Sequence, residues 1–147
     1  MKRTKILTFI IAAFVLFGFQ QCTAQKPENW TKDQLIEPAS LAKTIDSKEN
    51  IPLIFCVGPG VVIPNSINIG TASEENNLKK FKDSLSKIPR SADIVIYCGC
   101  CPFDHCPNVR PAIAALKEMN FTNYHLLDLP HNIKTDWIAK GYPDISK

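Results

Sequence analysis

The sequence predicts an α/β protein with a mainly parallel central sheet, because short apolar segments alternate with amphipathic ones along its 147 residues. Apolar runs at residues 51–57, 93–97 and 124–129 have the length and composition of buried strands. Between them, residues 71–88 and 108–119 repeat apolar side chains at helical spacing. Strands separated by helices run parallel in one sheet, and ligands of such sheets gather at the carboxyl ends of the strands.

The N-terminal residues 1–24 are predicted to be a secretory signal peptide. Three basic residues precede an apolar run at residues 6–19, and the small residue Ala24 follows a few positions later. A spanning helix needs about 20 apolar residues, so this shorter run predicts no stable transmembrane span. We therefore expect export, with a bacterial periplasm as the destination.

Two routes of processing compete for this segment. Cleavage after Ala24 would release a soluble chain that begins at Gln25, and this is the favoured route. In the alternative, the protein is a lipoprotein anchored through Cys22. Gln20 and Gln21 fit that alternative poorly, because they stand where the lipoprotein pattern requires small residues.

Removal of residues 1–24 changes the charge balance. The whole chain has 17 Lys and Arg against 14 Asp and Glu, and the removed segment carries three basic residues and no acidic ones. The remaining balance of 14 against 14 gives no electrostatic signal for nucleic acid or for an anionic surface. The rest of the chain divides into a polar linker at residues 25–32 and one domain at residues 33–147.

The domain begins with a segment that contains a proline. Residues 33–48 have apolar side chains at mixed helical spacing, which predicts one or two short helical turns interrupted at Pro38. Residues 51–57 (IPLIFCV) follow as a buried strand. Cys56 lies inside this strand and is interpreted as a small core residue in preference to a functional thiol.

Residues 61–88 predict a weak strand followed by a clear helix. Residues 61–69 look like a broken strand with a turn at Pro64 and Asn65. Residues 71–88 form the amphipathic helix, and its lysines are interpreted as a solvated face.

The second half repeats the alternation. A strand at residues 93–97 leads into a cysteine-rich loop and then into a helix at about residues 108–119. Pro111 is tolerated only in the first turn of that helix, where its missing N–H has no partner to lose, so the helix begins just after the cysteines. Residues 124–129 predict another strand, and residues 132–140 a short C-terminal helix.

Four cysteines within nine residues mark the candidate site: Cys98, Cys100, Cys101 and Cys106. Together with Cys56 they leave five thiols after residues 1–24 are removed, so complete pairing within the chain is impossible. An oxidising compartment favours disulfides among them, with at least one thiol left over. The loop joins the end of a strand to the start of a helix, where backbone N–H groups and the helix dipole favour a reactive thiolate.

Taken together, these segments resemble a rhodanese domain, the single-domain sulfurtransferase fold. Residues 63–69 (IPNSINI) are similar to the family's Ile-Pro-Gly-Ala-Ile-Asn turn, and residues 94–98 (IVIYC) to its strand that ends in Tyr-Cys. Residues 137–143 (WIAKGYP) are similar to its closing Trp-x-x-x-Gly-x-Pro, and the helix end at residues 116–121 also fits. The resemblance extends over about residues 33–144.

The resemblance implies a five-stranded, mainly parallel sheet flanked by helices, with the catalytic cysteine directly after the central strand. That position is Cys98. In the family this cysteine accepts a sulfane sulfur as a persulfide, from thiosulfate or a similar donor, and passes it to a thiol or to cyanide. The other three loop cysteines are candidates for a resolving or disulfide-forming partner: Cys100, Cys101 and Cys106. The predicted site contains no cofactor and no metal.

Two basic residues of the loop are further candidates. Arg110 or His105 would supply the positive charge that holds the thiolate. The competing interpretation of His105 is a solvent-exposed loop residue beside Asp104, and that of Arg110 is a surface salt bridge of little energetic value.

Several positions depart from the family's pattern. Phe103 stands five residues after Cys98, where the family usually has an arginine, and counting back from the helix end puts Asn108 in that place. The loop therefore carries about five extra residues. Cys56 lies near the place of an acidic residue that often ends the early strand, and a Leu-Pro pair at residues 129–130 replaces a Gly-Gly pair.

Other functions use the same cysteines. Cys98 and Cys101 have the C-x-x-C spacing of thiol–disulfide exchangers, although they lie seven or more residues before the helix. The four thiols and His105 are also soft ligands for Zn or Cu(I), but their spacing lacks the two separated pairs of a zinc ribbon. In a third alternative, disulfides or a metal hold the loop of a non-catalytic module. A phosphatase is disfavoured, because the arginine that would clamp phosphate is missing from its place.

Overall fold

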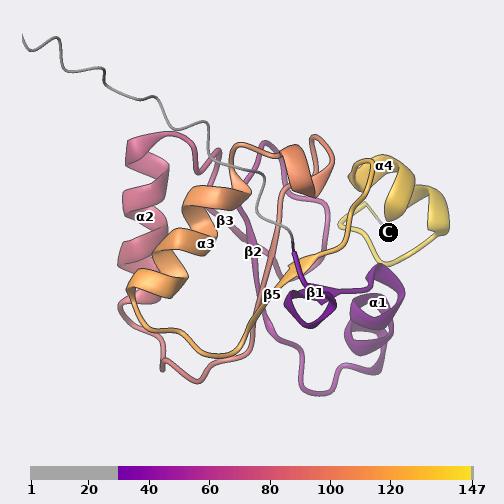
Figure 1. Ribbon diagram of the computed structural model, residues 1–147. Helices are drawn as coiled ribbons and strands as arrows, with labels where there is room; N and C mark the ends of the chain where they lie inside the picture. Colours follow the sequence, from indigo (N-terminus) through magenta and orange to yellow (C-terminus); the bar gives the residue numbers. More distant parts are fainter. Residues whose placement is uncertain (1–29, 147) are drawn as a thin grey trace, which may run out of the picture.

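The computed structural model describes residues 30–146 and arranges them in three layers, with a sheet between two sets of helices (Figure 1). All neighbouring strands are parallel, and their order is β1-β5-β4-β2-β3. The strands are β1 (Leu35–Ile36), β2 (Leu53–Cys56), β3 (Ile67–Asn68), β4 (Ile94–Tyr97) and β5 (Tyr124–Leu127). The predicted α/β class with a five-stranded parallel sheet is confirmed, and the architecture is consistent with a rhodanese-like fold.

In the described part of the chain, four α-helices cover the sheet. Figure 1 shows α2 and α3 on one side of it, and α1 and α4 on the other. Their bounds are α1 (Pro38–Ser47), α2 (Glu75–Leu85), α3 (Val109–Glu118) and α4 (Ile133–Asp136). Three 3₁₀ turns complete the described elements, at Lys32–Gln34, Phe103–His105 and Ile138–Lys140.

The central strand β4 divides the core in two, because successive side chains of a strand point to opposite faces. Ile94 and Ile96 pack with the buried residues of α2 and α3. Val95 and Tyr97 pack with those of α1 and with Trp137. All four residues of β4 are buried, which explains why the strand has a continuous apolar sequence.

The segment around Pro38 differs from the expected turns. Pro38 is the first residue of α1, where its missing N–H has no helical partner, so it starts a helix and does not interrupt one. Before it, Leu35 and Ile36 form the edge strand β1 and pair with Leu126 and Leu127 of β5. A strand of two residues has no recognisable periodicity, which is why the sequence gives no signal for it.

The other elements lie where the sequence predicts them, although two of them are shorter than expected. The helix after the cysteines begins at Val109, so Pro111 lies in its first turn as predicted. The strand expected at residues 61–69 is reduced to Ile67–Asn68, after a turn at which Asn65 has a positive φ of 62°. The helix expected at residues 132–140 divides at Trp137 into α4 and a 3₁₀ turn.

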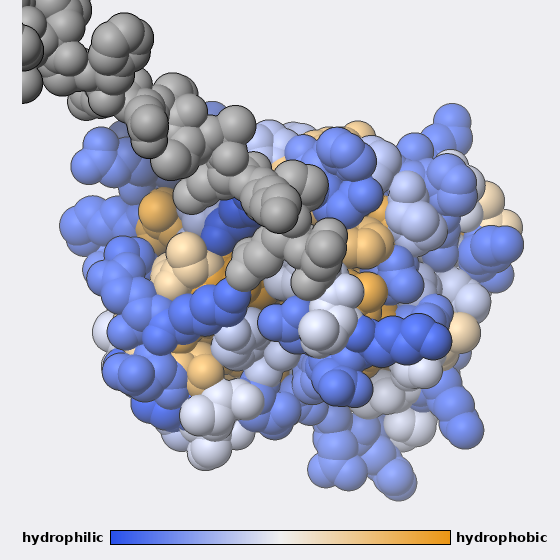
Figure 2. Space-filling model, in the orientation of Figure 1, coloured by the Kyte–Doolittle hydropathy of each residue, from blue (hydrophilic) through white to orange (hydrophobic). Residues whose placement is uncertain are grey.

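The predicted signal peptide, Cys22 and all but the last residues of the predicted linker lie outside the described residues. Within residues 30–146, no helix has the length and apolar character that a membrane span requires. The side shown in Figure 2 is mostly hydrophilic, with small and separate hydrophobic areas.

Candidate functional site

Cys98 directly follows β4 at the carboxyl end of the central strand, the edge of a parallel sheet where ligands gather. The residue is only 2% exposed and packs on the side of the sheet covered by α2 and α3. Gly58 of the neighbouring strand end makes room for it. A Cβ atom at Gly58 would lie 2.4 Å from the Cys98 sulfur, so only glycine fits there without displacing the thiol.

The loop after Cys98 folds back and gathers four thiols, hereafter the four-thiol cluster: Cys98, Cys100, Cys101 and Cys106. The Sγ atoms of Cys98 and Cys100 are 3.2 Å apart, and those of Cys100 and Cys101 are 3.3 Å apart. All four Sγ atoms lie within 4.8 Å of one another. Cys98 and Cys106 are buried, Cys101 is partly buried and Cys100 is exposed. The cluster thus connects the core with the surface.

The segment between β5 and α4 holds this loop in place. The Phe103 N–H donates to the Leu129 carbonyl at 3.2 Å, and the Ile133 N–H donates to the Gly99 carbonyl at 3.0 Å. A Cβ atom at Gly99 would lie 2.7 Å from the Ile133 side chain, so this glycine allows the close approach. In Figure 1 the loop accordingly lies near α4 at one end of the sheet.

Asn108, the residue before α3, joins the cluster to a third segment. The residue is 3% exposed, and its side-chain Nδ2 donates to the Cys98 sulfur at 3.5 Å. Its Oδ1 accepts a hydrogen bond from the Ser73 N–H at 3.1 Å, which fixes the orientation of the amide. Asn108 therefore presents an N–H donor to the Cys98 sulfur from inside the core.

These contacts favour a thiolate at Cys98. Hydrogen bonds from the Cys106 thiol, the Cys100 backbone N–H and the Asn108 side chain lower the pKa of Cys98 to about 5, against the opposing effect of burial. The pKa of Cys106 is raised because its thiol donates to Cys98 and because it is buried. Burial and donation to Cys98 raise the pKa of Cys100 to about 12. The cluster therefore concentrates negative charge on the buried Cys98 sulfur.

The two predicted basic residues, His105 in the loop and Arg110 in the first turn of α3, have other partners. His105 is largely exposed, and its Nδ1 lies 2.7 Å from the Asp104 carboxylate. The Arg110 guanidinium donates to the Asp104 carbonyl at 2.9 Å and so supports the 3₁₀ turn. Within residues 30–146, no hydrogen bond or ion pair joins either side chain to the Cys98 thiol. Their role at the thiolate stays a prediction.

Cys56 lies apart from the four-thiol cluster. It is fully buried at the end of β2, and its thiol donates to the Gly60 carbonyl at 3.1 Å. Burial raises its pKa, as expected of a core thiol. All five described cysteines are free thiols, so the disulfide expected among the loop cysteines stays a prediction for the oxidised protein.

Two site residues were not predicted as such. Asn108 had a signal, since it stands where the family arginine falls when residues are counted back from the helix end. Gly58 had none, because a Gly-Pro-Gly turn after a strand is ordinary and only the three-dimensional contact with Cys98 makes this glycine special.

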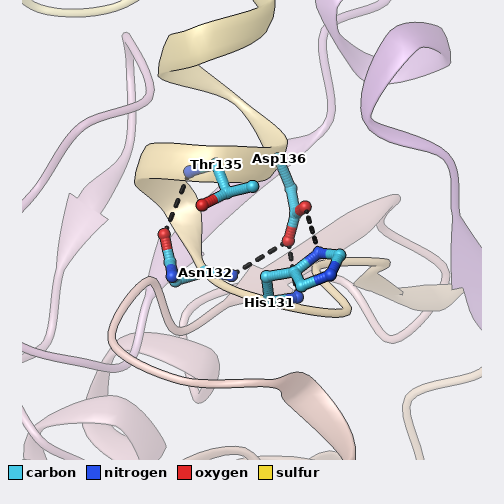
Figure 3. Close-up of polar contacts among 4 residues, drawn as sticks. All are labelled: His131, Asn132, Thr135 and Asp136. Atoms are coloured by element: carbon cyan, nitrogen blue, oxygen red, sulfur yellow. Dashed lines mark hydrogen bonds and ion pairs between the residues drawn. The ribbon is translucent and has the colours of Figure 1, made fainter.

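A polar network next to the loop caps α4 (Figure 3). The Asp136 carboxylate accepts hydrogen bonds from the backbone N–H groups of His131 and Asn132, at 2.7 and 2.9 Å. The His131 ring lies 2.9 Å from the same carboxylate, and the Asn132 side chain accepts from the Thr135 N–H. These bonds fix the start of α4, from which Ile133 contacts the cysteine loop.

No model of a known protein family matches the chain, and no curated protein is significantly similar to it. The fold and the site define a class in physical terms. The protein has a parallel α/β sheet with a four-thiol cluster at the carboxyl end of its central strand.

Proposed function

We propose that the protein is a rhodanese-like sulfurtransferase that carries sulfane sulfur as a persulfide on Cys98. The observation that carries this proposal is the position of Cys98, directly after the central strand of a five-stranded parallel sheet and with the Asn108 N–H aimed at its sulfur. Donor groups around a sulfur atom at this edge of a sheet stabilise both a thiolate and the anionic persulfide formed from it.

The proposed reaction needs no oxidant or reductant beyond its two substrates. The Cys98 thiolate attacks the outer sulfur of thiosulfate, the S–S bond of the donor breaks, and sulfite leaves with the electron pair. A thiolate or cyanide then attacks the outer sulfur of the persulfide. The Cys98 thiolate is regenerated, and the product is a new persulfide or thiocyanate.

The surrounding residues have distinct roles in this proposal. The Asn108 side chain and the Cys100 backbone N–H hold the negative charge on the sulfur. Gly58 provides the space that the thiol occupies. Cys100 is exposed and 3.2 Å from the Cys98 sulfur, which suits it to receive the outer sulfur or to resolve the persulfide.

We further propose that this activity belongs to an exported protein. The basic and apolar pattern of residues 1–24 supports export, with a bacterial periplasm as the compartment and anchoring through Cys22 as the alternative. Cell fractionation of a producing bacterium, compared with a chain that lacks residues 2–24, tests this part. Equal cytoplasmic retention of both chains would contradict it.

The central experiment is the intact mass of the reduced, metal-free protein after incubation with thiosulfate. The background is the full chain with Cys22→Ser and Cys56→Ser, so that the four-thiol cluster holds the only cysteines. We expect a gain of one sulfur atom that cyanide removes and that Cys98→Ser abolishes. No gain in the background protein refutes the proposal, and a gain that survives Cys98→Ser moves the nucleophile to another cysteine of the cluster.

Thiol–disulfide exchange is a second candidate, favoured by the distance of 3.2 Å between the Cys98 and Cys100 sulfurs. A disulfide bond requires a further approach to about 2.05 Å, which small side-chain rotations can provide. If the protein is a thiol–disulfide exchanger, it catalyses the reduction of insulin by a dithiol reductant. Cys98→Ser and Cys100→Ser would then each abolish this catalysis. Retained activity in both variants excludes exchange through this pair.

A further inference from the structure

We propose that the four-thiol cluster is also a binding site for one thiophilic d¹⁰ metal ion, with the ligand chemistry that Zn²⁺ and Cu(I) share. This inference does not depend on sulfur transfer. It rests on the arrangement of four sulfur atoms that belong to one short loop and that converge on one point between the core and the surface.

The distances fit a tetrahedral thiolate site. A Zn–S bond of about 2.3 Å implies a separation of about 3.8 Å between the sulfurs of a tetrahedron. The measured Sγ separations of 3.2 and 3.3 Å, and the upper limit of 4.8 Å for all pairs, lie on both sides of this value. Small rotations of the cysteine side chains are therefore enough to surround an ion.

The donor set selects the class of metal. All four candidate ligands are sulfur atoms, and among residues 30–146 no carboxylate or imidazole joins them. Hard cations such as Mg²⁺ and Ca²⁺ require oxygen ligands, whereas thiolates select Zn²⁺ and Cu(I). An all-sulfur tetrahedral set with every position filled by protein resembles a structural site more than a catalytic one.

The protein also provides an outer shell for the thiolates. The backbone N–H groups of Asn108 and Val109, at the start of α3, are directed at the Cys106 sulfur. The Cys100 N–H and the Asn108 side chain are directed at the Cys98 sulfur. Such N–H groups stabilise the negative charge of a metal thiolate centre and orient its ligands.

The chain reversal in the loop explains why sequence spacing misses this site. Zinc ribbons use two separated pairs of cysteines, and the adjacent Cys100 and Cys101 do not fit that pattern. In the structure, the 3₁₀ turn at Phe103–His105 reverses the chain and returns Cys106 to the other three thiols. The four thiols are therefore close together in the structure, although their spacing along the chain is not that of a zinc ribbon.

Metal binding and persulfide formation would use the same sulfur, so they compete. An ion held by Cys98 takes up negative charge from the thiolate and crowds it, which weakens its attack on thiosulfate. In a cell, the cluster would then be more available for sulfur when the metal is absent. This consequence applies if the proposed function is correct, whereas the metal site can be tested without it.

The test is a titration of the reduced full chain with Co²⁺ and Zn²⁺, in the background that carries Cys22→Ser and Cys56→Ser. We expect the chain to bind one Co²⁺ with the intense absorption of a tetrahedral tetrathiolate centre. One Zn²⁺ should displace this Co²⁺, and the protein should compete with a coloured chelator for the Zn²⁺. A parallel anaerobic titration with Cu(I) and a Cu(I) chelator shows which of the two ions is preferred. Binding of either ion to all four thiols supports the site.

Two single variants separate an effect on metal binding from an effect on folding. Cys100→Ser and Cys101→Ser change exposed or partly buried side chains, so circular dichroism should report an unchanged fold. Each should convert the Co²⁺ spectrum to that of three thiolates and weaken Zn²⁺ binding by more than the roughly 10- to 100-fold that loss of an outer-shell partner costs.

The inference is overturned if the protein takes neither ion from its chelator when protein and chelator are present at equal concentration. It is also overturned if binding is unchanged in both Cys100→Ser and Cys101→Ser. Loading with thiosulfate is measured on separate, metal-free samples. Failure of sulfur transfer and failure of metal binding are therefore distinct results.

Discussion

Individual residues decide how the Cys98 thiol is presented. Gly58 provides room for the sulfur, Asn108 provides a donor from the core, and Cys100 lies on the solvent side. The three residues come from different segments of the chain. Of these residues, the cysteines could be predicted because their chemistry is visible in the sequence. Asn108 had only a positional signal, and the role of Gly58 depends on a contact that forms only in the fold.

Replacement of Gly58 by alanine tests the space at the thiol. The new Cβ would overlap the Cys98 sulfur and approach the Cys98 Cβ to 3.3 Å, so we expect the thiol to rotate away from Asn108 and Cys100. Overpacking of this kind costs about 1–3 kcal/mol of folding stability. The mass assay with thiosulfate should show a clear loss of sulfur loading, while circular dichroism reports a folded protein. Normal loading in Gly58→Ala would show that the thiol does not need this space.

Replacement of Asn108 by aspartate tests the donor. The aspartate retains an acceptor for the Ser73 N–H but turns an acceptor toward the Cys98 sulfur, where asparagine has an N–H. Loss of a hydrogen bond to a charged group costs about 1.5–3 kcal/mol, which corresponds to roughly tenfold or more in rate. We expect sulfur loading to slow by at least this factor. Asn76→Asp adds the same charge at an exposed position of α2 and should have no effect.

At the scale of elements, segments with a strong pattern could be predicted and short ones could not. The continuous apolar run of β4 and the amphipathic pattern of α2 are visible in the sequence, and Pro111 correctly fixes the start of α3. The edge strands β1 and β3 have two residues each, too few for a periodicity. Their conformation follows from pairing with β5 and β2, which is tertiary information.

The polar network at the start of α4 supports the cysteine loop from outside the site. Its Asp136 carboxylate accepts two backbone N–H groups (Figure 3). These two N–H groups belong to the residues that directly precede the helix. Ile133 of the same helix donates to the Gly99 carbonyl beside Cys98. The position of the cysteine loop therefore depends on this network.

We predict that Asp136→Asn lowers the free energy of unfolding by about 1 kcal/mol at pH 7, because hydrogen bonds to a charged carboxylate are stronger than those to a neutral amide oxygen. Burial opposes the charged form, but the hydrogen bonds from His131 and Asn132 outweigh it and lower the pKa of Asp136. A lowered pKa in the folded state means that the carboxylate stabilises the fold above its unfolded pKa of about 3.9 and loses this effect as the pH falls through the folded value.

Urea unfolding at pH 7 and at several pH values below 4 measures both effects. The difference between wild type and Asp136→Asn should be largest at pH 7 and should shrink with acid. Asp83→Asn is the matched control, because it removes a carboxylate from an exposed ion pair with Lys79 that contributes little. A difference that does not change with pH would contradict the role given to the Asp136 charge.

At the scale of the whole molecule, the fold determines which distant segments meet at the cluster. Parallel strands place the ends of β2 and β4 at one edge, which brings Gly58 beside Cys98. The start of α3 and the segment before α4 enclose the loop from two further directions. The parallel topology and the edge that carries the site were predictable from alternating patterns. The convergence of four sulfurs was not, because it requires the reversal of a loop whose shape depends on contacts with β5 and α4.

Because the four-thiol cluster joins the core to the surface, metal binding to it should change the free energy of unfolding of the whole domain. An ion held by Cys98 and Cys106 in the core and by Cys100 and Cys101 at the surface would bind the native state and only weakly the unfolded chain. Free metal at 100 times its dissociation constant then adds about 2.7 kcal/mol to the free energy of unfolding. For a domain of this size, such an addition raises the midpoint of thermal unfolding by roughly 10 °C or more.

We therefore predict that Zn²⁺ raises the melting temperature of the reduced Cys22→Ser, Cys56→Ser chain and that a chelator reverses the rise. Cys101→Ser should melt near the metal-free value with and without Zn²⁺, because three thiolates hold the ion less tightly than four. Saturation of the shift at one equivalent of metal would connect it to a single site. A rise of equal size in Cys101→Ser would place the ion elsewhere on the protein, since a cluster that has lost one of its four thiolates binds the ion more weakly and stabilises the fold less.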